Sequence, residues 1–238
     1  VIRMIIGRGW GQGAQHSQSL ESLFAHIPGL KVVMPSTPSD AKGLLISSIE
    51  DNNPVIFLEH RWLHNKIDNV PLDGYRVPIG KARVAREGDH LTIIAHSYMV
   101  IEAIHCADRL KTKGLSIEVL DLRSIRPLDV DTILSSVKKT HRVLVVDNGW
   151  IFCGVSAEII STITENIFDE LISPPQRVGL NDSPSPSSRA LASNFYPKAI
   201  TIAKVACNLL NIHLDLDVLF PVSEFPDDIP NHNFKGPF

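Results

Sequence analysis

Short apolar runs alternate with helix-patterned segments along most of this sequence. The runs are rich in β-branched residues, as in "LKVVM" at 30–34, "VIFLE" at 55–59 and "RVLVV" at 142–146. Between such runs, apolar residues recur at helical spacing, as in the segments 35–51 and 97–114. Strands that are buried on both faces have continuous apolar runs of this kind. The repeated β-α-β order therefore predicts an α/β fold built from doubly wound, mostly parallel sheets.

A break in this rhythm divides the chain into two units. Residues 67–80 contain prolines and glycines without a sustained period, which is typical of a linker. We therefore expect a first unit at 1–66 and a second unit at 81–212. The chain opens inside an apolar strand without an initiator Met, so we expect the protein to have a preceding segment. Residues 213–238, rich in Pro, Asp and Asn, predict an extended tail outside the compact core.

The composition argues against several classes of function. The chain has 238 residues and a net charge of −3, so we expect neither nucleic acid nor an acidic membrane as a partner. No apolar run approaches the roughly 20 residues that span a bilayer. Three widely spaced cysteines argue against a disulfide framework or a cysteine-based zinc site, and indicate a reducing, cytoplasmic compartment. The sequence has no HExxH, CxxC or GxSxG motif, which makes a zinc enzyme or a serine hydrolase a poor interpretation.

The first candidate for a reactive group follows the first strand. The glycines of "GRGWGQG" at 7–13 lead directly into "AQHSQS", which contains His16. Glycines at alternate positions can bring the backbone close to a ligand or to another chain. A histidine in such a loop can act as a general acid or base near neutral pH. The same residues also fit a flexible loop and a helix start capped by Ser17 or Ser19, so both interpretations stay open here.

A second candidate stands at the end of the helix predicted over 35–51. Asp51 and Asn53 lie in "IEDNNP", where the last carbonyl groups of a helix lack partners within that helix. Carboxylate, amide and carbonyl oxygens together suit a hard cation. An ordinary helix end followed by a turn explains the same residues.

Two later segments carry charges or glycines at predicted strand ends. "DLRSIRPLD" at 121–129, predicted as a loop, stands where doubly wound folds bind ligands, but a salt-bridged turn fits it as well. "DNGW" at 147–150 and Gly154 precede a predicted helix, whose start can bind an anion or can simply follow a turn.

Together these blocks resemble one enzyme family. The stretch 14–60, "AQHSQSLESLFAHIPGLKVVMPSTPSDAKGLLISSIEDNNPVIFLEH", is similar to the β subunit of the thiamine-diphosphate-dependent 2-oxo acid dehydrogenase E1 component, pyruvate dehydrogenase type. "EVLDLRSIRPLDVDTI" and "VVDNGWIFCGVSAEI" resemble the C-terminal domain of that family. The resemblance runs from Val1 to about Ile212. It implies a partial pyrimidine-binding-type domain at 1–66 and a transketolase C-terminal-type domain at 81–212.

The resemblance also implies site residues. His16 matches the active-site histidine of the family, which lines the channel to the cofactor and helps the intermediate pass to the lipoyl group. Asp51 and Asn53, with the carbonyls of Ser48 and Ile49, match a potassium site. The family's glutamate that contacts the aminopyrimidine lies upstream of Val1, and the diphosphate and Mg²⁺ site lies on the α subunit. The residues of this chain that would contact thiamine diphosphate are therefore left unassigned.

The implied activity is oxidative decarboxylation of pyruvate or a related 2-oxo acid, with acyl transfer to a lipoyl-lysine. The implied partners are an E1 α subunit, a second β subunit in an α2β2 heterotetramer and the E2 acyltransferase. The implied location is the cytoplasm of a bacterium or the matrix of an organelle. We expect this chain alone to be inactive. Two alternatives remain: a non-catalytic fragment for assembly and E2 docking, and a relative of transketolase or deoxyxylulose-phosphate synthase.

Overall fold

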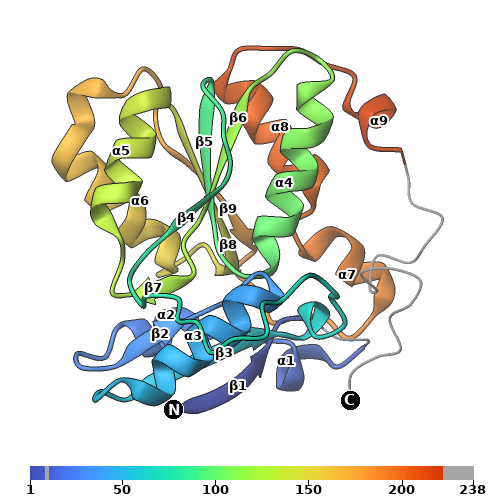
Figure 1. Ribbon diagram of the computed structural model, residues 1–238. Helices are drawn as coiled ribbons and strands as arrows, with labels where there is room; N and C mark the ends of the chain where they lie inside the picture. The colour runs from blue at the N-terminus through green and yellow to red at the C-terminus, as the bar shows by residue number, and fades with distance from the viewer. Residues whose placement is uncertain (9–10, 222–238) are drawn as a thin grey trace.

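The computed structural model describes residues 1–8 and 11–221. It places one sheet with its helices below a second, larger sheet, and the two units are in contact (Figure 1). The doubly wound α/β class predicted from the sequence is confirmed, because most neighbouring strands in both sheets run parallel.

The first unit forms a four-stranded sheet in the order β1-β3-β2-β7. Its pairs β1–β3 and β2–β3 are parallel, whereas β7 joins β2 antiparallel. The Thr37 side chain caps the helix α3 (Pro38–Glu50) by accepting from the Asp40 N–H at 3.1 Å. The elements of the first unit are β1 (Ile2–Ile6), α1 (Gly13–His16), α2 (Glu21–Ala25), β2 (Lys31–Val33), α3 (Pro38–Glu50), β3 (Val55–His60) and the 3-10 helix η1 (Arg61–Leu63).

The second unit forms a five-stranded sheet in the order β4-β6-β5-β8-β9, with only β4 antiparallel. Helices α4 and α8 cover one face and α5 and α6 the other (Figure 1). The elements are β4 (Arg83–Arg86), β5 (Leu91–Ala95), α4 (Tyr98–Lys111), β6 (Ile117–Asp121), β7 (Ser124–Arg126), α5 (Val130–Thr140), β8 (Val143–Trp150), α6 (Val155–Ile167), η2 (Phe168–Glu170), β9 (Gln176–Leu180), α7 (Arg189–Phe195), α8 (Ala199–Leu209) and α9 (Leu216–Leu219).

The prediction that 121–129 is a loop is wrong in its middle. Ser124–Arg126 is strand β7, which leaves the second unit and pairs with β2 of the first. The three residues are too few for a period to show in the sequence, and their pairing partner lies about a hundred residues away, so no local pattern indicates a strand. We call the contact between the two units, formed around β7, α2 and α6, the seam.

One apolar core crosses the seam. Met34 and Leu58 of the first sheet belong to the same buried cluster as Ile94 and Leu120 of the second. A second cluster lies between the five-stranded sheet, α4 and α8, and a smaller one under α3. Because the shared cluster is buried, the two units stabilise each other by removing apolar surface from water.

The predicted linker 67–80 contains neither helix nor strand, but its later part, with Tyr75, Val77 and Ile79, packs in the apolar cluster under α3. Tyr75 Oη donates to the Ser39 carbonyl at 2.6 Å, and Ser47 Oγ donates to the Val77 carbonyl at 2.7 Å. A Cβ added at Gly43 would lie 2.5 Å from a Val77 methyl carbon, so only glycine permits this approach.

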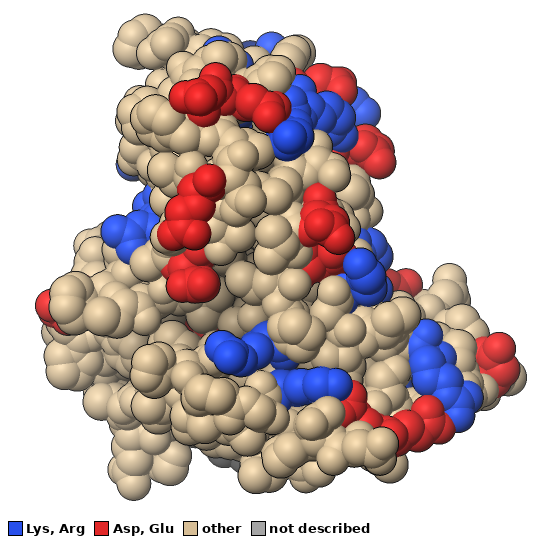
Figure 2. Space-filling model, turned by 90° about the vertical axis from the view of Figure 1, so that its left-hand side faces the viewer, with Lys and Arg blue, Asp and Glu red and all other residues tan. Residues whose placement is uncertain are grey.

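The first part of the predicted tail, 213–221, lies within the described residues. It contains the helix α9, which the sequence did not predict. Leu219 of α9 is buried, while residues 222–238 lie outside the described part of the chain. Within 1–8 and 11–221, no helix combines the length and apolarity needed to cross a bilayer. Acidic and basic side chains are interspersed on the face drawn in Figure 2, as the small net charge leads one to expect.

Candidate functional site

His16 is the last residue of the one-turn helix α1, and its side chain is exposed. The turn is tight because Gly13 has a φ of +54° and lies against Ser187, whose Oγ would be 2.2 Å from an added Cβ. Ser187 belongs to the second unit. The glycines therefore allow this loop to lie directly on the second unit, as a loop that presents a side chain requires.

Both units hold the backbone around His16. The buried Arg61 donates from Nη2 to the His16 carbonyl at 3.0 Å, and the Gly7 N–H donates to the Gln18 carbonyl at 3.2 Å. From the second unit, Ser185 Oγ donates to the Ser17 carbonyl at 3.4 Å. The loop is therefore fixed on several sides, while the imidazole of His16 faces solvent.

The capping interpretation of this segment is wrong. The next helix, α2, has Leu20 as its N-cap and no side-chain cap, and both Ser17 and Ser19 are buried. Ser17 and Ser19 instead lie between the units, so the segment serves the seam rather than the helix start.

The four residues predicted to bind potassium lie together at the end of α3. Asn53 donates to Asp51 Oδ1 from its backbone N and from Nδ2, both at 2.9 Å, and Lys31 forms an ion pair with Asp51 Oδ2. Lys31 and Asn53 lower the pKa of Asp51 to about 2. Ser48 is buried and Ile49 exposed. The Asp51 carboxylate thus already faces a cationic group, the Lys31 ammonium.

The strand-end segment 121–129 forms several ion pairs, one of them across the seam. Arg123 Nη1 donates to Asp40 Oδ1 at 3.0 Å, and Arg83 Nη2 donates to Asp121 Oδ2 at 3.1 Å. Ser36 of the first unit donates to the same Asp121 carboxylate. The charges of this segment thus form ion pairs, as the salt-bridged interpretation expected, although its middle is the strand β7 and not a turn.

A buried triad of titratable side chains was missed by the sequence reasoning. Glu21 begins α2, His96 follows β5, and Asp147 lies in β8. His96 Nε2 lies 3.6 Å from Glu21 Oε1 and 3.5 Å from Asp147 Oδ1, and the exposed fraction of each side chain is 1% or less. The three groups could hold a metal ion. A polar signal was present, because Asp147 directly follows the apolar run 142–146 and His96 directly follows the adjacent parallel strand β5.

The environment shifts all three pKa values. Burial opposes a charge on His96, but the Asp147 and Glu21 carboxylates outweigh burial and raise the pKa of His96 to about 10. Burial raises the pKa of Glu21, whereas His96 opposes that rise. For Asp147, burial is outweighed by His96 and by two backbone N–H donors, so its pKa falls to about 2.

Asp147 explains the glycine-rich segment after β8. Its Oδ1 accepts from the Gly149 N–H at 3.0 Å, and its Oδ2 accepts from the Ser156 N–H at 2.9 Å in the first turn of α6. The start of α6 therefore binds an anion, as one interpretation of the sequence had it, and the anion is the protein's own carboxylate.

A second buried charge lies beside the triad. The guanidinium of Arg8 stands 3.7 Å from the centre of the Trp62 ring and 4.8 Å from that of Tyr196. Glu102 accepts from Tyr98 Oη at 2.9 Å and from the Ala199 N–H at 2.8 Å. Arg8 comes from the first unit and Tyr196 from the second, so this cation–π cluster also joins the units.

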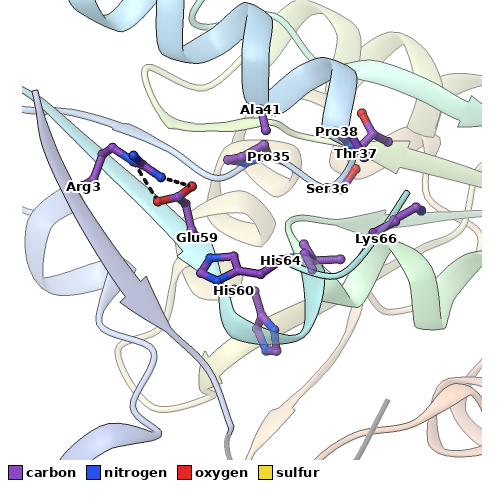
Figure 3. Close-up of a pocket in the computed structure, with 11 residues that line it drawn as sticks. Arg3, Pro35, Ser36, Thr37, Pro38, Ala41, Glu59, His60, His64 and Lys66 are labelled. Atoms are coloured by element: carbon purple, nitrogen blue, oxygen red, sulfur yellow. Dashed lines mark hydrogen bonds and ion pairs between the residues drawn. The ribbon is translucent and has the colours of Figure 1, made fainter. Parts of the chain in front are cut away.

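A pocket of about 360 Å³ opens on the first unit beside the carboxyl ends of β2 and β3. Arg3 and Glu59 form a two-point ion pair along one wall, with distances of 3.0 and 2.9 Å (Figure 3). His60, His64 and the start of α3 form other parts of the wall. His16 does not line this pocket, so the structure does not bring the two together.

Two different family models match the two units of the chain. The family model "Transketolase, pyrimidine binding domain" matches residues 1–66, and "Transketolase, C-terminal domain" matches residues 80–202. A split-gene transketolase, described as an inactive β4 tetramer, has a TM-score of 0.72 at 21% identity. The match covers 89% of this chain and 66% of that structure, and it supports the fold alone.

Curated relatives are more similar in sequence. The pyruvate dehydrogenase E1 component subunit β of Porphyra purpurea is 44% identical over 211 residues, which are 89% of this chain and 64% of that protein. The Bacillus subtilis protein of the same name is 46% identical, over 79% and 58%. The acetoin:2,6-dichlorophenolindophenol oxidoreductase subunit β of Cupriavidus necator is 42% identical, over 87% and 61%.

The chain thus spans about three-fifths of the length of these relatives. The family resemblance predicted from the sequence is confirmed by the two matched models and by the relatives. The chain belongs to the transketolase family, as a pyrimidine-binding unit joined to a C-terminal unit, and it is similar to E1 β subunits.

Proposed function

We propose that the chain is part of an E1 β subunit and contributes His16 to an active site. The parent enzyme would decarboxylate pyruvate or a related 2-oxo acid and transfer the acyl group to lipoyl-lysine of E2. The observation that supports this role is an exposed histidine on a backbone fixed by both units. A histidine held in this way can exchange protons with a large substrate that arrives from solvent, such as a lipoyl arm.

The described residues do not fit thiamine diphosphate by themselves. Mg²⁺ with a diphosphate needs accessible oxygen ligands, but the carboxylates of the triad are enclosed and Glu59 in the pocket is paired with Arg3. We therefore propose that other segments of the β subunit and the α subunit hold the cofactor and its Mg²⁺. When bound there, the cofactor supplies the decarboxylation chemistry.

His16 would act at the acyl acceptor. Reductive acylation leaves a thiol on the lipoyl group, and a nearby imidazolium can donate the proton that the leaving sulfur takes up. The neutral imidazole of His16 can then take up a proton from water, because the ring is exposed. This role needs proximity to the lipoyl sulfur and little contact with the cofactor.

Substituting His16 in the assembled α/β enzyme tests the proposal. We expect His16→Ala to lower the rate of reductive acylation of a lipoyl domain by about 100-fold or more, since general acid–base groups contribute on this scale. Cofactor affinity should change less than about twofold, as measured by fluorescence quenching. His26→Ala is the matched control, because His26 is also exposed and lies in the same unit. An unchanged acylation rate in His16→Ala would contradict the role.

We also propose that Ser48, Ile49, Asp51 and Asn53 bind potassium in the assembled enzyme. The end of α3 supplies carbonyl oxygens without helical partners, and Asp51 adds a carboxylate that is ionised above a pH of about 2. Lys31 occupies Asp51 Oδ2, so it would have to turn away or share the carboxylate when the cation binds.

A second candidate function is assembly: docking on E2, on an α subunit or on a second β subunit. Its support is the outer edge of β1, which pairs with no strand among the described residues and exposes Ile2 and Ile5. Co-purification of the chain with an α subunit and with the subunit-binding region of E2 tests it. Binding without any effect of His16→Ala on acylation would favour this candidate, and absence of binding would exclude it. We place such an assembly in the bacterial cytoplasm or an organelle matrix.

A further inference from the structure

The buried triad of Glu21, His96 and Asp147 joins the segment after His16 to the second unit. Glu21 belongs to the first unit, five residues after His16, while His96 directly follows β5 and Asp147 lies within the adjacent strand β8. Asp147 is already held by two backbone N–H donors. Both Glu21 oxygens, by contrast, have no hydrogen-bond partner among the described residues, and neither do the two ring nitrogens of His96, whose Nε2 lies 3.6 Å from Glu21 Oε1.

The two carboxylates are therefore not equivalent. Removing a carboxylate from water is costly unless a cation or donor faces it. The donors at Asp147 stay in place without His96, because they are backbone groups of β8 and α6. The position of Glu21, and with it the start of α2, depends on His96.

We propose that protonated His96 is a positioning residue for His16: it holds Glu21 against Asp147 and so fixes the α1–α2 segment on the second unit. The proposal rests on the proposed function of His16. The titratable groups that face His96 are Glu21 on α2 and Asp147 on β8, both acidic, so the surroundings favour its charged form. The charge is enclosed, so solvent does not screen it.

The route from the triad to His16 is short and stiff. Between Glu21 and His16 the chain is held by the Ser185 contact to Ser17 and by the Arg61 contact to the His16 carbonyl. Arg61 fixes the loop within the first unit. The triad and Ser185 fix the position of this loop relative to the second unit. A displacement of about 1 Å at a reacting group can lower the rate by up to about 100-fold.

A metal ion is the competing occupant of the triad. One atom from each of the three residues lies within 4.8 Å of the others. Asp147, however, uses both oxygens for backbone donors, and a metal would require His96 to be unprotonated at the coordinating nitrogen. The protonation state of His96 therefore distinguishes the two occupants.

The first experiment measures that state directly. In the purified protein with ¹⁵N-labelled histidine, we expect both ring nitrogens of His96 to carry protons at a pH of about 8, where exposed histidines are neutral. Assignment follows from loss of the signal in His96→Gln. Metal analysis of the dialysed protein should find no stoichiometric zinc or manganese. A neutral His96 or a bound metal would overturn the proposal.

The second experiment measures positioning in the assembled α/β enzyme. We expect His96→Gln and Glu21→Gln each to lower kcat for lipoyl acylation by about 10- to 100-fold, with little change in KM for the lipoyl domain. The double variant should be no worse than either single variant, because the two residues act as one unit. His105→Gln, an exposed histidine on α4, is the control.

A readout independent of catalysis separates this proposal from the function of His16. The rate at which diethylpyrocarbonate modifies His16 should change several-fold in His96→Gln if the loop moves, and it should stay constant in His105→Gln. If His16→Ala leaves acylation intact while His96→Gln still alters His16 reactivity, the proposed function fails and the coupling survives. If His96→Gln lowers stability but alters neither kcat nor His16 reactivity, the triad is merely structural and the positioning role is wrong.

Discussion

The two sheets differ in how complete they are. The five-stranded sheet has helices on both faces and a core in which Leu91, Ile93 and Ile117 are fully enclosed. The four-stranded sheet ends at β1, whose outer edge exposes Ile2 and Ile5, and its opposite end is β7, supplied by the second unit. The smaller sheet therefore takes both a strand and part of its core from the larger unit, whereas the larger sheet shares that core but takes no strand from the smaller unit.

The largest expected effect tests this asymmetry. Phe57→Ala and Leu91→Ala each remove an enclosed side chain, and we expect each to lower the free energy of unfolding by about 3–5 kcal/mol. Hydrogen exchange should show loss of protection in the first sheet alone for Phe57→Ala. For Leu91→Ala, protection should fall in both sheets, because the first depends on the second. Leu72→Ala, at a fully exposed position, is the control. Loss confined to the second sheet in Leu91→Ala would refute the asymmetry.

A smaller effect is expected from breaking the seam. Arg123→Ala removes the 3.0 Å ion pair with Asp40, whose side chain is 7% exposed, and leaves that carboxylate with only Arg83, at 3.5 Å, from the second unit. We expect the free energy of unfolding to fall by about 2 kcal/mol, since a hydrogen bond to a charged group contributes about 1.5–3 kcal/mol. Urea unfolding measures the loss. Arg76→Ala is the matched control, because Arg76 pairs with Glu50 at the surface, and a surface ion pair adds little stability. Equal effects of the two substitutions would show that the seam pair adds nothing.

The smallest effect concerns the end of α3. Asp51→Asn should cost about 0.5 kcal/mol at neutral pH, because the pair with Lys31 is partly exposed. The pKa of Asp51 is lowered, so this contribution is present above the unfolded-state pKa of about 4 and is lost as the pH falls towards about 2. As the pH falls from about 4 to about 2, the free energies of unfolding of the parent and of Asp51→Asn should therefore converge. In the assembled enzyme, KCl but not NaCl should raise the melting temperature of the parent alone. No difference between the salts would contradict the potassium site.

Most of the fold follows from local patterns in the sequence. The strand at 55–60 has a continuous apolar run, and the helices α3 and α4 have an apolar period, and these patterns decide the type of each element. The strand β7 could not be predicted in this way, since three residues carry no period and their pairing is made by tertiary contact. Helix α7 was missed as well, because "SSRALASNF" follows a segment rich in Ser and Pro that predicts a loop.

The residues of the candidate site show the same difference between local patterns and long-range contacts. His16 could be singled out because a glycine-rich loop and a family resemblance both point to it. Glu21 could not, since a glutamate near Ser17 and Ser19 fits a helix start equally well. Its burial beside His96 depends on how α2 lies on the second unit, which is a long-range contact that no local spacing encodes.

The contact between residues 67–80 and α3 has a consequence for engineering. Because Tyr75 and Val77 lie over Gly43, this segment is a strap fitted to one helix rather than a free tether. A generic glycine-serine spacer of equal length would keep the two units connected but would uncover the apolar side of α3. Chimaeras that exchange the second unit between relatives should therefore carry α3 and the strap from the same parent.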